Sequence, residues 1–98
     1  MNIQAMMKQA QKLQKDMMKE KNEIDQTVFE GKSSFVTVEV NGKKEILKFK
    51  IDCDSLDKDD IEALEDMAVV ALNEAMGKVD KLTEQKLGKY TQGMPGLF

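Results

Sequence analysis

The first quarter of the chain has an apolar residue at every third or fourth position, interrupted only by Glu20, which is the spacing of one face of an α-helix. The repeat comprises Ile3, Met6, Ala10, Leu13, Met17 and Ile24. A set of lysines spaced four, three and four residues apart falls on the opposite face: Lys8, Lys12, Lys15 and Lys19. The pattern predicts a helix over residues 1–25 with an apolar seam on one side and positive charge on the other.

From residue 27 the pattern changes to alternating β-branched and aromatic residues. The segments FVTVEV and EILKFKI flank Asn41-Gly42, a dipeptide that suits the two-residue type I′ turn of a β-hairpin. Pairing Val40 with Lys43 would place Glu39 opposite Lys44. The valines of the first segment would then share a core face with a set from the second: Leu47, Phe49 and Ile51.

A shorter strand is expected before this hairpin. Thr27 to Glu30 has strand-forming residues, and Gly31 with Ser33-Ser34 offers a turn after it. The pattern therefore predicts a three-stranded antiparallel sheet over residues 27–52.

The rest of the chain predicts a long helix over residues 57–90. Asp57 is a suitable N-cap, acids crowd the first turn, and a broad apolar stripe runs from Ile61 to Leu87. The sequence after this helix, ending QGMPGLF, has no helical or strand period, so a flexible tail is expected over residues 91–98.

A helix of this length has consequences for assembly. It would be about 45 Å long, whereas a compact domain of this size has a radius of gyration of roughly 13 Å. We expect its outer part to project, and a symmetric homodimer with paired helical arms to cover the apolar stripe. The predicted dimer interface comprises Ile3, Met6, Ala10, Leu13, Met17, Val79 and Leu82. Residues 1–98 thus form a single α+β domain.

Charge is distributed unevenly. The formal net charge is −3, yet residues 1–21 hold five lysines and two acids, so +3 lies there and −6 in the remainder. All fifteen basic residues are lysine, and there is no histidine. Because bidentate reading of guanine favours arginine, a nucleic-acid partner would be contacted mainly at its phosphates. Without histidine the usual general base is missing, so neither an enzyme nor a cofactor or small-molecule substrate is expected.

Other features exclude further classes. No apolar run approaches the roughly 20 residues that span a bilayer, and the start lacks the apolar stretch of a secretion signal, so a cytoplasmic protein is expected.

Cys53 is the only cysteine, which rules out an intrachain disulfide. Residues 52–66 hold eight acids, but the fifth and sixth positions of a calcium loop counted from Asp52 are Leu56 and Asp57. We therefore expect no metal site.

The lysine face of the first helix could follow a phosphate backbone. Its end members, Lys8 and Lys19, would lie about 16 Å apart along a helix, a distance comparable with a DNA groove and its flanking phosphates. The alternative is a solvated helix face, and the spacing does not decide between them. The charge pattern adds a second set of candidate phosphate contacts near the end of the long helix: Lys78, Lys81, Lys86 and Lys89.

Four stretches together resemble the YbaB/EbfC family of bacterial nucleoid-associated proteins: MMKQAQKLQKDMMKEKNEI, VTVEVNGKKEILKFKID, SLDKDDIEALEDMAVVALNEA and QGMPGLF. The resemblance implies a tweezer-like homodimer that binds DNA with little sequence preference and acts in nucleoid organisation and gene regulation, without catalysis. It also implies a nucleoid location in the cytoplasm. On this resemblance the DNA-facing role falls on Lys8, Lys12, Lys15 and Lys19, whereas the candidates on the long helix rest on charge alone.

The leading hypothesis is thus a dimeric protein that binds double-stranded DNA through lysine–phosphate contacts. The alternative is a helical interaction scaffold for a replication or repair protein, because an apolar seam can bind a partner helix as readily as a second copy.

Overall fold

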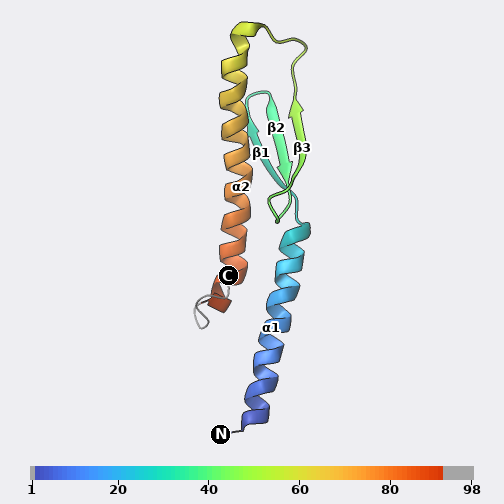
Figure 1. Ribbon diagram of the computed structural model, residues 1–98, viewed down its shortest axis with the longest axis vertical. Helices are drawn as coiled ribbons and strands as arrows, with labels where there is room; N and C mark the ends of the chain where they lie inside the picture. Colours follow the sequence, from blue (N-terminus) through green and yellow to red (C-terminus); the bar gives the residue numbers. More distant parts are fainter. Residues whose placement is uncertain (1, 92–98) are drawn as a thin grey trace.

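The N-terminal helix, α1, spans Ile3–Gln26 and is followed by three strands and a second helix (Figure 1). The strands are β1 (Phe29–Ser33), β2 (Val36–Val40) and β3 (Ile46–Ile51), and a short 3-10 helix, η1 (Lys58–Asp60), leads into α2 (Ile61–Thr91). This computed structural model describes residues 2–91, so the predicted tail lies outside the described residues except for Thr91, the last residue of α2. The expected α+β class is confirmed.

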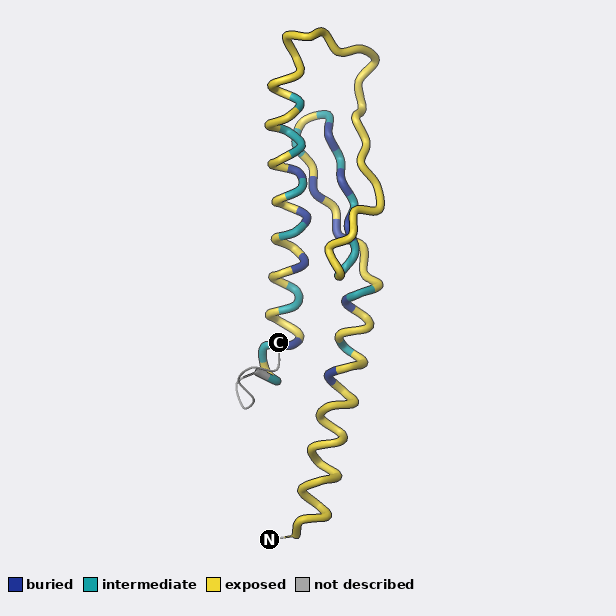
Figure 2. Tube along the Cα trace, in the orientation of Figure 1, coloured by how far each residue is buried: buried dark blue, intermediate teal, exposed yellow. Residues whose placement is uncertain are grey.

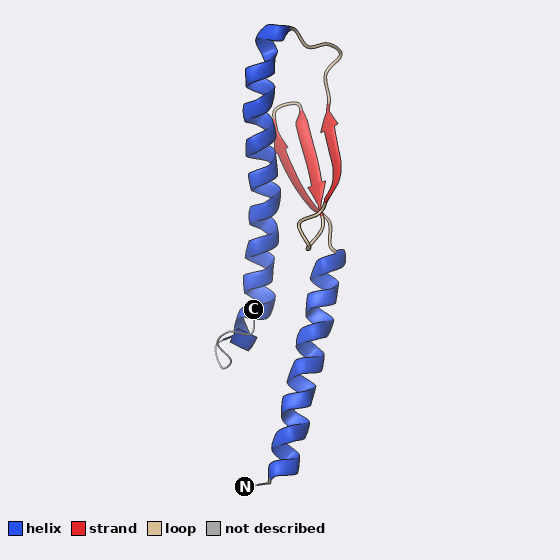
Figure 3. Cartoon of the chain, viewed as in Figure 1, coloured by secondary structure: helices blue, strands red, loops and turns tan. Residues whose placement is uncertain are grey.

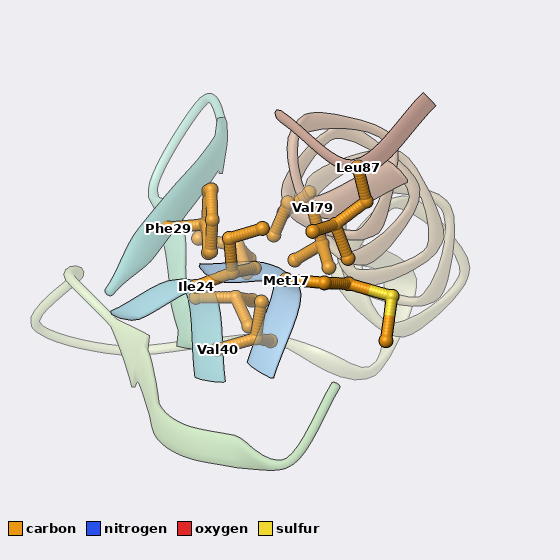
Figure 4. Close-up of a cluster of buried hydrophobic side chains, with 10 residues drawn as sticks. Met17, Ile24, Phe29, Val40, Val79 and Leu87 are labelled. Atoms are coloured by element: carbon orange, nitrogen blue, oxygen red, sulfur yellow. The ribbon is translucent and has the colours of Figure 1, made fainter. Parts of the chain in front are cut away.

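The sheet lies beside α2 (Figure 3), and the core is formed by one face of the sheet, α2 and the second half of α1 (Figure 4). The strand order is β1-β2-β3, with both pairs antiparallel. Three valines of β2 are fully buried, facing the small side chains Ala71 and Ala75 of α2. Gly31 of β1 permits this close approach, because a Cβ there would lie 1.9 Å from the carbonyl oxygen of Ala71.

The β2–β3 hairpin exists, but its predicted turn and register are wrong. Val40 pairs with Ile46 and Glu39 with Lys48, and the connection is a β-turn from Asn41 to Lys44, closed by Lys44 N–H donating to the Asn41 carbonyl at 2.9 Å. Lys44 has a φ of 64°, as in a three-residue hairpin loop with a bulge. A type I′ turn would instead need positive φ at Asn41.

Two interactions favour the longer loop. The Asn41 side-chain oxygen accepts hydrogen bonds from the backbone N–H groups of Lys43 and Glu45, at 2.9 and 3.0 Å. Gly42 packs against the end of α1, where a Cβ would lie 2.0 Å from the carbonyl oxygen of Ile24. Lys44, expected opposite Glu39, instead pairs with Asp80 of α2 at 2.7 Å.

The first strand begins two residues later than predicted. β1 starts at Phe29 and includes Gly31, which was expected in a turn. The turn lies at Ser34-Phe35, between paired Ser33 and Val36, and Ser34 has a positive φ of 51°. Packing explains the shift, because the close contact of Gly31 with α2 requires this residue within the sheet.

β3 shares the core face of the sheet without being covered. Phe49 pairs with Val38 and Ile51 with Val36, as the expected parity requires. Phe49 nevertheless remains 44% exposed and Ile51 40%, since α2 packs on β1 and β2. We call the exposed apolar side chains of this strand the β3 apolar surface: Ile46, Leu47, Phe49 and Ile51.

The projecting element is the first half of α1, rather than the outer part of the long helix as expected. α2 carries buried side chains as far as Leu87, whereas every residue of α1 before Met17 is exposed (Figure 2). The chain measures 71 × 20 × 14 Å, and its radius of gyration of 19.4 Å exceeds the roughly 13 Å of a compact domain. The structure thus presents one free helical arm per chain.

Candidate nucleic-acid interface

The free arm and the turn of α1 that follows it carry the lysine face predicted from the sequence. Asn2 caps α1, its side-chain oxygen accepting from the N–H groups of Gln4 and Ala5 at 3.0 and 3.3 Å. Met17 and Ile24 turn one side of the helix towards α2, which leaves the opposite side to solvent. The four lysines of that side are exposed and form no ion pair with the described residues: Lys8, Lys12, Lys15 and Lys19.

A shallow hollow lies along the end of this lysine face. It has a volume of about 620 Å³, and Lys15, Lys19, Asn22 and Gln26 are among its lining residues. Asp16 and Glu23 line it too, so its charges are mixed. The unopposed positive charge of α1 is therefore concentrated towards its N-terminal half, where every described residue is exposed.

The lysines predicted on α2 fall into two groups. Lys78 donates to the carbonyl oxygen of Glu30 at 2.6 Å and pairs with Glu74 at 3.4 Å. Lys89 donates to Glu20 at 3.3 Å. Lys81 and Lys86 are exposed and form no ion pair with the described residues.

The contact between Glu20 and Lys89 joins the two helices. The hydrogen bond from Lys89 to Glu20 raises the pKa of Lys89, and the charge of Glu20 raises it further. Lys89 also lies over the ring of Tyr90, 5.1 Å from its centroid. Desolvation raises the pKa of Tyr90, with a further contribution from Glu20. These contacts join α1 to the end of α2, so the ammonium group of Lys89 is already engaged within the described chain.

The residues predicted for a dimer interface divide in a similar way. Met17 and Val79 are buried in the chain's own core, at 7% and 2% exposure, and Leu82 packs against that core. The remaining members lie exposed on the free arm: Ile3, Met6, Ala10 and Leu13. The β3 apolar surface is a further uncovered region, and three of its members, Leu47, Phe49 and Ile51, were expected to be core.

Sequence reasoning did not select four exposed lysines of the sheet and its hairpin: Lys32, Lys43, Lys48 and Lys50. Strand alternation could have identified three of them, because Lys32, Lys48 and Lys50 fall on the side of the sheet opposite the buried valines. Lys43 could not be placed in this way, since its position depends on the hairpin loop.

The acidic segment forms the opposite end of the chain. Asp57 lies at the N-cap of η1 rather than of α2, and its N–H donates to the Asp60 carboxylate at 3.0 Å. Within residues 2–91, no group of three or more carboxylate, thiol or imidazole side chains is arranged to hold a metal ion. Cys53 is exposed with a free thiol. Neither helix, as far as it is described, is both long and apolar enough to cross a membrane.

The comparisons with known proteins agree on one family. The model of the YbaB/EbfC DNA-binding family matches residues 1–94. A nucleoid-associated protein of Lactococcus lactis subsp. cremoris (strain MG1363) is 50% identical over 97 residues, covering 97% of this chain and 98% of the relative. Nucleoid-associated proteins of Ligilactobacillus salivarius (strain UCC118) and Enterococcus faecalis (strain ATCC 700802 / V583) are 43% and 40% identical, covering 99% and 97% of this chain and 95% and 93% of the relatives. The chain belongs to the YbaB/EbfC DNA-binding family.

Proposed function

We propose that this protein binds duplex DNA with little sequence preference, through contacts between the lysine face of α1 and backbone phosphates, and thereby alters DNA conformation and gene expression. The observation that carries the proposal is the exposed lysine face of α1, with Lys8, Lys12 and Lys15 on the free arm and Lys19 just beyond it. None of the four has an acidic partner in the described chain. Ammonium groups contact phosphates as point charges, which position a protein on DNA without reading its sequence. The names of the relatives support a nucleoid location.

A salt titration tests the contacts directly. Each phosphate neutralised by a lysine contributes about −0.9 to the slope of log K against log salt for duplex DNA. Replacing all four lysines of the α1 face with Gln should therefore make the slope shallower by up to about 3.6 for each chain that contacts the DNA, equally for two unrelated duplexes. An unchanged slope would remove these residues from the interface. Failure of the wild-type protein to bind either duplex at low salt would contradict DNA binding itself.

A matched pair of double variants separates local contacts from overall charge. Lys12→Gln with Lys15→Gln removes two unpaired charges from the free arm, whereas Lys78→Gln with Lys89→Gln removes two that are engaged within the chain. Both pairs change the net charge equally. We expect the first pair to lower affinity at least several-fold more than the second, and equal losses would indicate only a general charge effect.

The proposal includes Lys81 and Lys86 as secondary contacts. They lie exposed on the later part of α2, which packs beside the second half of α1. Lys78 and Lys89 could join them only by giving up their contacts with Glu30, Glu74 and Glu20. We therefore rank the α2 lysines below those of the free arm.

We further propose that the protein works as a homodimer in which a second copy covers the β3 apolar surface. Four large apolar side chains on one edge strand are between 40% and 54% exposed, and monomeric proteins rarely leave such a patch uncovered. A dimer would also present the lysine face twice. Sedimentation equilibrium of the wild-type protein and of Phe49→Asp tests this, since the variant should be monomeric. A wild-type monomer at micromolar concentration would contradict the proposal.

The exposed seam of the free arm favours a second candidate function, a scaffold that binds a partner helix. Ile3, Met6 and Leu13 are 71%, 52% and 41% exposed, which suits helix-in-groove recognition. A stoichiometric protein partner retained after nuclease treatment, and lost on Leu13→Asp, would support this function. Retention that depends on DNA would instead support the leading proposal.

A further inference from the structure

The outer face of the sheet, the side away from α2, carries a second group of lysines. In one cross-strand row Thr37 lies between Lys32 and Lys50, and in the next row Glu39 lies between Glu30 and Lys48. All three lysines are exposed and form no ion pair with the described residues. We call these six side chains the outer sheet face.

The outer sheet face and the lysine face of α1 follow one another along the molecule. α2 packs against the sheet through Ala71, Ala75 and Val79, and against α1 near Leu87. In the view of Figure 1 the sheet and α1 lie on the same side of α2, one beyond the other along its length. Their far faces, which hold the lysines, both turn away from α2.

The hairpin loop connects these two faces. A second shallow hollow of about 420 Å³ lies between the end of α1 and β3, and Lys43 and Leu47 are among its lining residues. It shares Asn22 and Gln26 with the hollow that Lys15 and Lys19 line. The contact of Gly42 with Ile24 fixes the loop against α1.

Two of the acidic residues between the lysine face of α1 and the outer sheet face form contacts of their own. Asp25 pairs with Lys21 at 3.6 Å, and Glu45 accepts a hydrogen bond from the Asn41 side chain at 2.8 Å. The outer sheet face holds three lysines and two acids, Glu30 and Glu39, so its net charge is +1. The face is thus weakly positive, unlike the acidic end formed by residues 52–66.

We propose that Lys43 and the lysines of the outer sheet face continue the phosphate-binding surface of α1, so that one chain contacts the DNA backbone along both elements. The inference rests on the proposed function and extends the DNA contacts from α1 to the sheet and its hairpin loop. Its partner is the backbone of duplex DNA, because unpaired ammonium groups along an extended path recognise phosphates and no bases.

Lysines on edge strands have another use, since they prevent sheets from pairing edge to edge. β1 and β3 are both edge strands, so this explanation covers Lys32, Lys48 and Lys50 equally. It predicts that replacing them changes solubility and leaves DNA affinity unaltered. The two explanations therefore differ in a measurable way.

The test is a salt titration of the full-length triple variant Lys32→Gln, Lys48→Gln and Lys50→Gln on the duplexes used for the wild type. We expect the slope of log K against log salt to become shallower by about 0.9 for each phosphate that is no longer neutralised, up to about 2.7 for each chain that contacts the DNA. Lys43→Gln should add up to about 0.9 more. Circular dichroism and the melting temperature establish that each variant is folded.

Neutralising acids gives a complementary test with a matched control. Glu30→Gln with Glu39→Gln removes two negative charges from the outer sheet face, and should raise DNA affinity several-fold. Glu62→Gln with Glu65→Gln removes two from the acidic end and should have a smaller effect. Equal gains from both pairs would overturn the inference.

The outcomes separate the two proposals. If the wild type binds DNA with a steep salt dependence and the triple variant keeps the same slope, the inference is overturned and the proposed function stands. If the wild type does not bind at low salt, both fall together. A shallower slope in the triple variant as well as in the α1 variant supports both.

Discussion

The two halves of α1 share one hydrophobic repeat but have different surroundings. In residues 17–26, Met17 and Ile24 are buried against α2 and the sheet, and Glu20 contacts Lys89. In residues 3–16, every member of the same repeat is exposed. The comparison shows that periodicity identifies which face of a helix is apolar, whereas the length of the neighbouring elements decides how much of it is covered. The second half anchors the helix, and the first half is left to meet a partner.

Gly42→Val should have the largest effect on the anchored half. A Cβ at this position would lie 2.0 Å from the Ile24 carbonyl oxygen, so the hairpin loop and the end of α1 would have to separate. We expect a loss of about 4 kcal/mol or more in the free energy of unfolding, measured by urea denaturation. Gly77→Ala is the control, because a Cβ there meets nothing within 4 Å and should add about 1 kcal/mol through helix propensity. Similar stability of Gly42→Val and the wild type would contradict the close packing.

Truncation at equivalent positions of the repeat compares the two halves directly. Ile24→Ala removes a side chain that is only 4% exposed and should cost about 3 kcal/mol in the free energy of unfolding. Met6→Ala removes one that is 52% exposed and should stay within about 0.5 kcal/mol. A large cost for Met6→Ala that grows with protein concentration would show that a second copy covers the free arm.

The sequence predicted the elements well because their patterns are local. The lysine spacing identified the exposed face of α1, and Asn41-Gly42 identified the hairpin. The register failed because the loop is stabilised by the Asn41 side chain and by the fit of Gly42 against Ile24, and the second of these is a tertiary contact. The exposure of β3 also depends on how much of the sheet α2 covers.

The candidate site was predictable to a similar extent. Spacing and charge selected the lysines of α1, and the structure leaves these exposed. The i,i+4 spacing could have indicated Glu74 as a partner of Lys78. It could not show the contacts of Lys78 with Glu30 and of Lys89 with Glu20, because these partners lie 48 and 69 residues away in the sequence. Local charge therefore indicates which residues can contact a phosphate, and the fold decides which are unpaired.

The smallest expected effect concerns pH and the contact between the two helices. Protonated Lys89 donates to Glu20, and this hydrogen bond raises the lysine pKa; desolvation and Glu20 raise that of Tyr90. Folding therefore favours the protonated form of both groups. This contribution to stability is fully present below the ordinary pKa values, which are 10.5 for Lys89 and 10.0 for Tyr90. It is lost as the pH rises through the raised pKa values of the folded protein.

The melting temperature of the wild type should accordingly fall between pH 9.5 and pH 11.5, and that of Glu20→Gln should fall less over the same range, because the variant lacks the carboxylate that raises both pKa values. Below pH 9 the two proteins should respond to pH in parallel. Equal falls at high pH would show that other lysines dominate the alkaline transition. A smaller fall in the variant would show that the second half of α1 is held by a contact that the free arm has no means of making, since Lys8, Lys12 and Lys15 have no partner in the described chain.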